Sequence, residues 1–233
     1  MTVQKTALIT GASRGLGLAL AEILAQQGWQ LLINGRNAER LLEVYNRLSK
    51  TTKVIAISGD VVDEIHLLQL KQALEQNQWS LNLVVNNAST LGVSPLLPLL
   101  EHPIENLHQI LHTNMIAPVS LLQKVKSYLK TDAKVINISS DAGFENYETW
   151  GAYGSSKAGL DHITATLAKE NENLFFYAFD PGDMRTDMYQ AAFPDEDISD
   201  RPLPMEVAVP SLLRLINESF ESGRYTADRM AEK

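Results

Sequence analysis

Short runs of apolar residues alternate along the chain with stretches in which apolar residues recur every third or fourth position. The apolar runs are residues 6–10, 30–34, 53–58, 81–85, 133–138 and 174–179. Runs of this length are typical of buried strands, whereas the spacing of Leu16, Leu20 and Leu24 is typical of an amphipathic helix. Strands that alternate with helices predict a parallel sheet with helices on both faces, which is a doubly wound, three-layer α/β/α fold.

The helical stretches between these strands have less sharp boundaries. They run to about residue 27, over 37–48, from 63 onward, over about 103–126, to about 171 and over about 205–222, and residues 224–226 are a candidate for one more strand. Residues 183–204 show little periodicity, which fits a substrate lid or a surface loop. Residues 1–233 fit a single domain, because α/β folds of about 200–250 residues are often undivided.

Composition narrows the classes of function. The formal net charge is −8 and no dense cluster of lysine and arginine occurs, so nucleic acid and anionic membranes are not expected partners. The absence of cysteine excludes disulfides, thiol catalysis and cysteine-ligated metals. Residues 1–10 are too short and polar for a secretory signal, and no apolar run is long enough to span a bilayer. We therefore expect a cytoplasmic protein.

A glycine-rich turn joins the first strand to its helix. Gly11, Gly15 and Gly17 have the spacing G-x-x-x-G-x-G, unlike the commoner dinucleotide-binding spacing G-x-G-x-x-G. Glycines permit positive φ and close approach of the backbone, and a helix N-terminus offers free N–H groups to a phosphate. This order of elements predicts a pyrophosphate site, and the alternative interpretation is a turn that is tight for structural reasons alone.

Charged residues after the next strands indicate which dinucleotide is bound. NAD sites carry a carboxylate about 20 residues after the glycines, whereas an arginine there suits the 2′-phosphate of NADP. The second strand ends at Asn34 without a carboxylate, Arg36 follows it, and Arg14 lies within the glycine turn. Because the guanidinium fork matches phosphate oxygens, these arginines favour NADPH over NADH. Asp60 has two interpretations, as an acceptor for the adenine amino group and as a turn or N-cap residue.

Polar residues also follow the fourth and fifth strands. We expect the amides of Asn86 and Asn87 both to tie neighbouring strands together and to line the cofactor site. After the fifth strand, Ser139 and Ser140 lie where ligands bind in an open parallel sheet.

A proline interrupts the helical stretch 103–126. Pro118 has no N–H, so the carbonyl of Asn114 lacks its usual helical partner. The two interpretations are a simple kink and a carbonyl that holds a water molecule. His108 and His112 share a face of this helix, but the glutamate of a zinc-protease helix is missing, so we predict no metal site.

Tyr153 and Lys157 lie one helical turn apart, so their side chains share a face. A free phenol has a pKa of about 10, which is too high for acid–base work near neutrality. A neighbouring ammonium favours the phenolate, so we expect Lys157 to lower the pKa of Tyr153 and to fit it for proton transfer in carbonyl or alcohol chemistry.

Taken in order, these residues resemble the motifs of the short-chain dehydrogenase/reductase family over nearly the whole chain. The matching segments are Thr10-Gly11-Ala12-Ser13-Arg14-Gly15-Leu16-Gly17, Asp60, Asn86-Asn87-Ala88, Asn114, Ser140, Tyr153-x-x-x-Lys157 and Pro181-Gly182 followed by Thr186. Each match is weak alone, whereas their common order and spacing are highly specific. The glycine spacing and the chain length resemble the compact branch of the family, which implies a Rossmann sheet and an oxidoreductase.

The resemblance implies roles for four catalytic residues. Tyr153 is the implied general acid in carbonyl reduction, and Ser140 is the implied hydrogen-bond partner of the substrate oxygen. The family's serine stands three residues before a glycine and thirteen before the tyrosine, which selects Ser140 over Ser139. Lys157 would lower the tyrosine pKa and hold the nicotinamide ribose, and the Asn114 carbonyl would hold a water that relays protons to Lys157.

The implied contacts with NADP(H) come from the turns at the strand ends. They are Gly11, Ser13, Arg14, Leu16, Asn34, Arg36, Asp60, Val61, Asn87, Ala88, Tyr153, Lys157, Pro181, Gly182, Met184 and Thr186. Met184 and Thr186 would contact the nicotinamide carboxamide, and Arg14 and Arg36 the 2′-phosphate. Candidates to line the substrate pocket, most of which also suit simple packing, are Ser89, Asp141, Phe144, Trp150, Met184 and Met188.

Two departures from the family pattern concern the C-terminal part. The sixth strand ends in Phe179-Asp180-Pro181-Gly182, where many members have Asn-x-x-x-Pro-Gly. The glycine-rich C-terminal strand of many members is replaced by Ser-Gly-Arg-Tyr-Thr-Ala-Asp at 222–228. These departures bear on the substrate and on C-terminal assembly.

The sequence thus predicts an NADPH-dependent reductase of a small ketone or aldehyde. The alternatives are an alcohol dehydrogenase working oxidatively, for which NAD preference would be the sign, and a non-catalytic NADP-binding regulator. By analogy we expect a homodimer or homotetramer, with the helices that carry Asn114 and Tyr153 at the interface.

Overall fold

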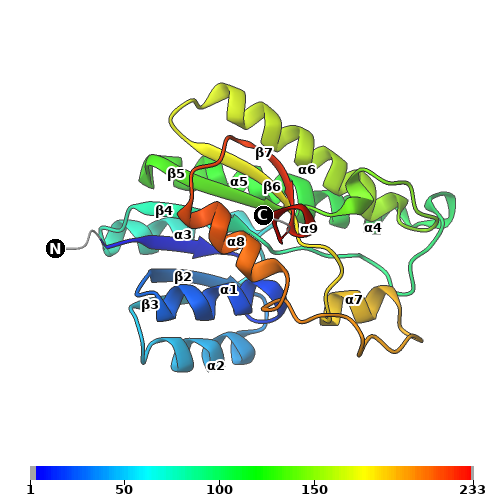
Figure 1. Ribbon diagram of the computed structural model, residues 1–233, viewed down its shortest axis with the longest axis horizontal. Coiled ribbons are helices and arrows are strands. Elements are labelled where there is room, and N and C mark those ends of the chain that lie inside the picture. Colours follow the sequence, from blue (N-terminus) through cyan, green and yellow to red (C-terminus); the bar gives the residue numbers. More distant parts are fainter. Residues whose placement is uncertain (1–3, 232–233) are drawn as a thin grey trace.

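The computed structural model describes residues 4–231. Within this range one parallel sheet has the strand order β3-β2-β1-β4-β5-β6-β7. Its strands are β1 (Thr6–Ile9), β2 (Gln30–Gly35), β3 (Val54–Ser58), β4 (Leu81–Asn86), β5 (Leu129–Ile138), β6 (Phe175–Asp180) and β7 (Gly223–Thr226) (Figure 1). The chain winds outward from β1 to both edges, which confirms the doubly wound Rossmann fold.

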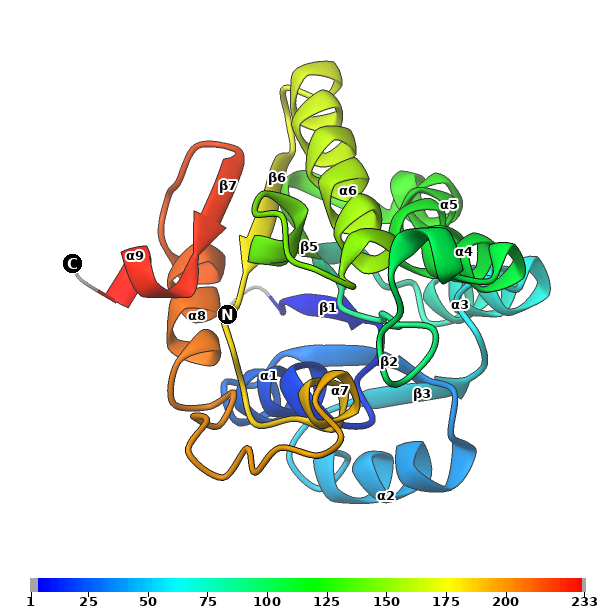
Figure 2. The same cartoon turned by 90° about the vertical axis from the view of Figure 1, so that its right-hand side faces the viewer.

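Helices cover both faces of the sheet. The helices α1 (Gly15–Gln26), α2 (Ala38–Leu48) and α8 (Ala208–Asn217) lie on one side, and α3 (Glu64–Gln76), α4 (Ile104–Leu111), α5 (Ala117–Val125) and α6 (Gly151–Glu170) lie on the other (Figure 2). The short helix α7 (Asp187–Ala192) lies beyond the sheet, and α9 (Ala227–Ala231) follows β7. Within residues 4–231, no helix is both long and apolar enough to cross a bilayer.

The strands build two cores because successive side chains point to opposite faces. Ile9 and Ile33 pack in the core beneath α1, α2 and α8, whereas Leu8 and Leu32 pack in the core beneath α3 and α5. Strands that are buried on both faces need continuous apolar runs, which explains why these runs stand out in the sequence.

The helical stretch around Pro118 is divided as the missing N–H requires. The helix α4 ends at Leu111, a π-helical turn occupies His112–Ile116, and α5 begins at Ala117 with Pro118 in its first turn. Proline is tolerated there because the first N–H groups of a helix have no partner within it. Asn114 lies in the middle of the π turn, a kind of interruption that is frequent at functional sites.

The predictions were least accurate near the C-terminus. The helix predicted over 205–222 spans only Ala208–Asn217, because Glu218 is extended and Phe220 turns back to pack against Tyr225 with ring centroids 5.5 Å apart. The strand candidate at 224–226 is confirmed as β7, which joins β6 in parallel. The segment 183–204 contains α7, whose six residues are too few to leave a clear periodic pattern.

Candidate active site

The carboxyl ends of the central strands open into a cavity of about 850 Å³. It extends from the turn after β1, past the ends of β4, β5 and β6, to α7. This is the point where the strand order reverses between β1 and β4, the usual ligand crevice of an open α/β sheet. Every predicted cofactor contact, from Gly11 to Thr186, lines this cavity, and so does Ser140.

The N-terminus of α1 is prepared for an anion. The N-cap residue Arg14 makes no side-chain cap to the first turn, whereas Asn37, Asp63 and Thr186 cap α2, α3 and α7. The main chain of Gly11 has φ +66, and a Cβ there would lie 2.8 Å from the Asn87 amide nitrogen. Uncapped N–H groups and a turn that admits only glycine fit a pyrophosphate in the cavity.

The end of the cavity beside β2 is cationic at its surface. Arg36 lies 4.0 Å from Asp60, whose Oδ1 also accepts from the N–H of Val62, so Asp60 is a turn residue as well as a cavity residue. Arg14 donates to Asp187 at 2.8 Å, and Arg40 lies 3.5 Å from the same carboxylate. Arg40 was missed from the sequence, because it lies in the first turn of α2 with no motif around it.

Asparagine side chains tie the strand ends together. Asn86 donates to Asn137 at 2.7 Å between β4 and β5, and Asn87 donates to the carbonyls of Thr10 and Gly11. Asn34 is buried and donates to the carbonyl of Gly59. The expectation that Asn86 and Asn87 tie neighbouring strands together is therefore confirmed, while their contact with a cofactor stays a prediction.

The loop of Ser140 is pressed against α6. A Cβ on Gly143 would lie 2.9 Å from the backbone nitrogen of Ala158, so only glycine permits this approach beside Lys157. The hydroxyl of Ser140 donates to Asp141 at 2.9 Å and accepts from the N–H of Ala142. The glycine three residues after Ser140 thus has a structural role: it lets the loop approach α6, which places the Ser140 hydroxyl next to the helix that carries Tyr153.

Tyr153 and Lys157 are both buried in α6 and face the cavity. The Lys157 ammonium lies 5.4 Å from the centroid of the Tyr153 ring and donates to the carbonyl of Ile138 at 2.7 Å. Burial lowers the pKa of Lys157 to about 8, although Asp161 and Asp180 act in the opposite direction.

The direction predicted for the pKa of Tyr153 is wrong. Burial raises the pKa of this phenol, and the hydroxyls of Ser89 and Ser140 only partly offset that effect. The sequence indicated a cation beside the phenol but did not indicate how completely the ring is removed from water.

Asn114 holds three elements in place through its buried side chain. Its Oδ1 accepts from the Ser89 hydroxyl and from the N–H of Thr90, and its Nδ2 donates to the carbonyl of Thr90 and to Ser156 on α6. The side chain is not among the residues that line the cavity. Its predicted role through the main-chain carbonyl remains a prediction.

The part of the cavity next to Tyr153 is apolar. The ring of Trp150 lies 5.7 Å from that of Tyr153 and 5.9 Å from that of Phe193, and Leu91 and Met188 pack around them. Ser89, Asp141 and Met184 also line the cavity. Phe144 does not, because it follows the short 3₁₀ turn Asp141–Gly143 and its side chain is 77% exposed. The prediction that Phe144 lines the pocket is therefore wrong.

An ion network that was not predicted from the sequence lies behind the site. Arg224 of β7 donates to Asp161 of α6, to Asp180 at the end of β6 and to the carbonyl of Ser140. No group of His, Asp and Glu within residues 4–231 could hold a metal ion.

Comparisons with known proteins agree with this site. Residues 5–197 match the family model of short chain dehydrogenases. The diacetyl reductase, (S)-acetoin forming, of Staphylococcus epidermidis is 30% identical over 229 residues, which cover 96% of this chain and 86% of the relative. A protein from Escherichia coli CFT073 complexed with NADPH is 26% identical, with a TM-score of 0.87 and 96% of each chain covered. The RhlG/NADP active-site complex of Pseudomonas aeruginosa is 28% identical, with a TM-score of 0.84 over 95% of this chain and 94% of that one.

Proposed function

Because the chain belongs to the short chain dehydrogenase family, we propose that it reduces the carbonyl group of a small, uncharged ketone or aldehyde with NADPH. The family makes the chain an oxidoreductase. The observation that carries the finer proposal is that Ser140, Tyr153 and Lys157 line the same cavity as the uncapped N-terminus of α1. A proton donor and a dinucleotide site therefore open into one space.

The cofactor is NADP(H), which the solved relatives also contain. The uncapped N-terminus of α1 would hold the pyrophosphate, and Arg14, Arg36 and Arg40 lie where the 2′-phosphate is expected. Lys157 would hold the ribose of the nicotinamide half. When bound, the cofactor supplies the hydride, and the protein supplies orientation and the proton.

Tyr153 supplies the proton in this proposal. The phenol is protonated at neutral pH and can donate to a carbonyl oxygen that gains negative charge, but the pKa raised by burial makes it a weak acid unless the phenolate is stabilised. Lys157 is mostly protonated at pH 7, and its charge stabilises the phenolate left by the transfer. The Ser140 hydrogen points to Asp141 and would turn toward the substrate oxygen when substrate binds.

The surroundings of Tyr153 favour an uncharged substrate. Leu91, Trp150 and Phe193 offer an apolar wall, while the carboxylates of Asp141 and Asp183 line the same cavity. These carboxylates would repel an anionic substrate such as a keto acid, because like charges would face each other across the cavity.

A turnover screen tests the proposal. The purified protein is incubated with NADPH and, separately, with an aryl ketone, a vicinal diketone, an aldehyde and a keto acid of similar size, and loss of NADPH absorbance is followed. We expect turnover of the uncharged compounds and little with the keto acid. Tyr153→Phe should lower kcat by about 10²–10⁴-fold, since a positioned acid contributes about this much.

The same screen separates a reductase from a non-catalytic regulator. Tyr153→Phe should bind NADPH as the wild type does, so that lost turnover reports lost chemistry. NADPH binding without turnover of any carbonyl compound would favour the non-catalytic regulator. Full activity in Tyr153→Phe would refute the assigned mechanism.

A further inference from the structure

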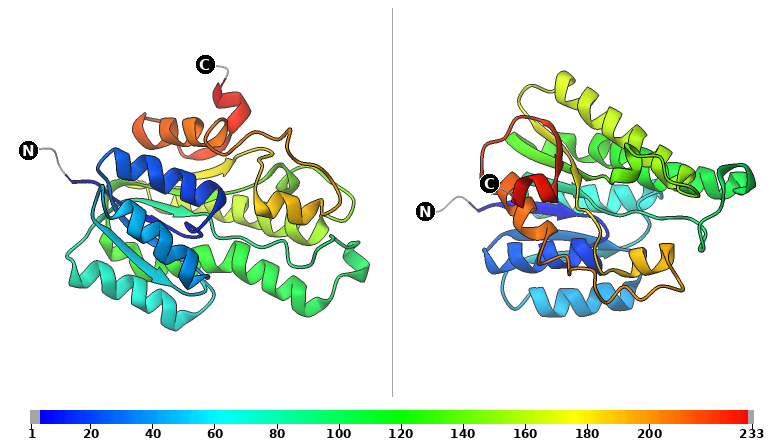
Figure 3. Two further views of the ribbon diagram at one scale, coloured as in Figure 1. Left: turned by 90° about the horizontal axis from the view of Figure 1, so that it is seen from below. Right: turned by 45° about the vertical axis from the view of Figure 1, so that its right-hand side comes forward.

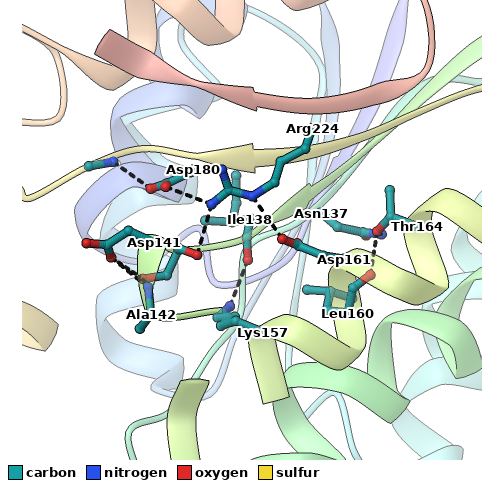
Figure 4. A network of polar contacts seen from close by, with 12 residues as sticks. Asn137, Ile138, Asp141, Ala142, Lys157, Leu160, Asp161, Thr164, Asp180 and Arg224 are labelled. Atoms are coloured by element: carbon teal, nitrogen blue, oxygen red, sulfur yellow. Dashed lines mark hydrogen bonds and ion pairs between the residues drawn. The ribbon is translucent and has the colours of Figure 1, made fainter. Parts of the chain in front are cut away.

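The guanidinium of Arg224 joins four elements behind the site. Its Nε lies 3.0 Å from Asp161 on α6, and one terminal nitrogen lies 2.9 Å from Asp180 and 3.1 Å from the main-chain carbonyl of Ser140. Figure 4 shows the guanidinium between the two carboxylates, with Lys157 and the carbonyl of Ile138 close by. One side chain from β7 thus reaches the ends of β5 and β6 and the helix that carries Tyr153.

Both carboxylates are removed from water. The side chain of Asp180 is 8% exposed and that of Asp161 is 19% exposed. The second oxygen of Asp161 has no hydrogen-bond partner within the described part of the chain. A buried carboxylate is costly unless it is paired, so Arg224 supplies the countercharge that permits both acids to lie here.

The same two carboxylates act on the reactive helix. Asp161 lies one turn after Lys157 on α6, and Asp180 lies at the end of β6, where it lines the cavity. Both favour the charged form of Lys157, and Asp180 and Asp141 disfavour the phenolate of Tyr153. The charge that faces Lys157 therefore depends on how far Arg224 neutralises these acids.

The remaining contact of Arg224 concerns the position of Ser140. The carbonyl of Ser140 accepts from the N–H of Gly143 within the loop and from Arg224, which also donates to Asp161 on α6 and so ties the loop to that helix. A planar fork holds this carbonyl and the two carboxylates at fixed angles, whereas the donors of a lysine ammonium radiate from one rotating nitrogen.

We propose that Arg224 is a positioning residue of this site: its guanidinium fixes the main chain of Ser140 against α6 and holds the Asp161 and Asp180 carboxylates in neutralised pairs behind Lys157. The consequence for turnover rests on the function proposed above, whereas the consequence for Lys157 does not. Arg224 lies in the segment 222–228 that stands in place of the glycine-rich strand of many family members, and its partner Asp180 lies in the other segment that departs from the family pattern.

The first test is a titration that needs no turnover. The ammonium of Lys157 is followed by NMR with labelled lysine and assigned with Lys157→Met, in the wild type, Arg224→Met and Arg224→Lys. Loss of the guanidinium leaves two carboxylates unneutralised, so the pKa of Lys157 should rise by about half a unit or more in Arg224→Met. Arg224→Lys keeps the charge and should stay closer to the wild type.

The second test is the split between kcat and KM. With the loop of Ser140 released, kcat should fall about tenfold in Arg224→Met while KM stays within about threefold, because a small displacement at a reacting centre affects the chemical step most. Arg224→Lys should recover little of kcat, since it lacks the fork. Arg47→Met removes a surface guanidinium that pairs with Glu22 at 2.6 Å, away from the cavity, and should leave both readouts unchanged.

The outcomes are distinct. An unaltered Lys157 titration together with wild-type kcat in Arg224→Met would overturn the positioning role. If the wild type turns over no carbonyl compound but the titration of Lys157 still shifts, the proposed function fails and the electrostatic part of the role stands. If Arg224→Met does not fold, Asp161→Asn replaces it: loss of that carboxylate should lower the pKa of Lys157, and an unchanged value would contradict the proposal.

Discussion

The ammonium of Lys157 is the most constrained charge of the molecule's reactive centre. It is 2% exposed, donates to the carbonyl of Ile138, and has a pKa lowered to about 8 because burial penalises its charged form. Free lysine binds its proton more tightly, so the folded protein is penalised for carrying this charge at neutral pH. The buried ammonium beside Tyr153 thus lowers the free energy of unfolding at neutral pH.

This cost predicts a dependence of stability on pH. The folded-state pKa lies below the unfolded value, so the contribution of Lys157 to stability is complete above the unfolded pKa and is lost as pH falls through the folded pKa of about 8. The free energy of unfolding of the wild type relative to Lys157→Met should therefore rise by about 2–3 kcal/mol from pH 7 to pH 10. Urea titrations of both proteins at the two pH values measure it.

The comparison of the two proteins removes the effect of titrating groups that do not interact with Lys157. Lys157→Met also loses the hydrogen bond to Ile138 at all pH values, which changes the offset between the proteins but not its slope. A constant difference between pH 7 and pH 10 would mean that the ammonium is not penalised by burial.

At the scale of elements, α7 closes the cationic end of the cavity. It begins after the cap residue Thr186 and lies beyond the N-terminal end of α1, joined to β6 and α8 by loops (Figure 3). Asp187 in its first turn pairs with Arg14 and Arg40. The Asp187 carboxylate is therefore paired with arginines that would otherwise bind a 2′-phosphate.

A competition of this kind predicts opposite effects from two changes. Asp187→Asn frees the arginines and should tighten NADPH binding about two- to fivefold, which is the range expected of an exposed ion pair. Arg14→Gln combined with Arg36→Gln should weaken NADPH binding about tenfold or more. Fluorescence titrations with NADPH and NADH measure both.

NADH provides the matched control because it lacks the 2′-phosphate. Its affinity should change little in either variant. Equal weakening of NADPH and NADH by the arginine changes would contradict the assignment of these side chains, and unchanged NADPH binding in Asp187→Asn would show that α7 does not compete.

The elements that the sequence predicted well are those with a local cause. The strands, the glycine turn before α1 and the break at Pro118 each follow from residues that are adjacent in the chain. The end of α8 and the position of α7 depend on Phe220 packing on Tyr225 and on Asp187 meeting Arg14. Such contacts join distant parts of the chain and leave no periodic pattern.

The same distinction holds within the site. The positions of Ser140, Tyr153 and Lys157 could be predicted because motif spacing places them on known strand ends and helix faces. Arg224 could not be predicted, since its partners become neighbours only when β7 pairs with β6. The raised pKa of Tyr153 is likewise a product of burial by the assembled site rather than of its sequence neighbours.

At the scale of the whole molecule, one face keeps apolar side chains in water. Before and along α4 and the π turn, Leu100 is fully exposed, Ile104 is 58% exposed and Ile116 is 45% exposed. The helix α4 packs beside α6, so this patch adjoins the two helices for which an interface was predicted. Large aliphatic side chains exposed along one helical stretch are what a surface covered by another protein would present.

We expect this face to form the contact of a homodimer or homotetramer. Ile104→Glu combined with Ile116→Glu should shift the protein to monomer, because each change removes about 1–3 kcal/mol of apolar burial and places a charge in the contact. Sedimentation velocity over a range of concentrations measures the shift. Leu42→Glu provides the matched control, since Leu42 is 57% exposed on α2 across the sheet and should leave assembly unchanged. A wild-type protein that sediments as a monomer at all concentrations, or a double variant that sediments as the wild type does, would contradict this interface.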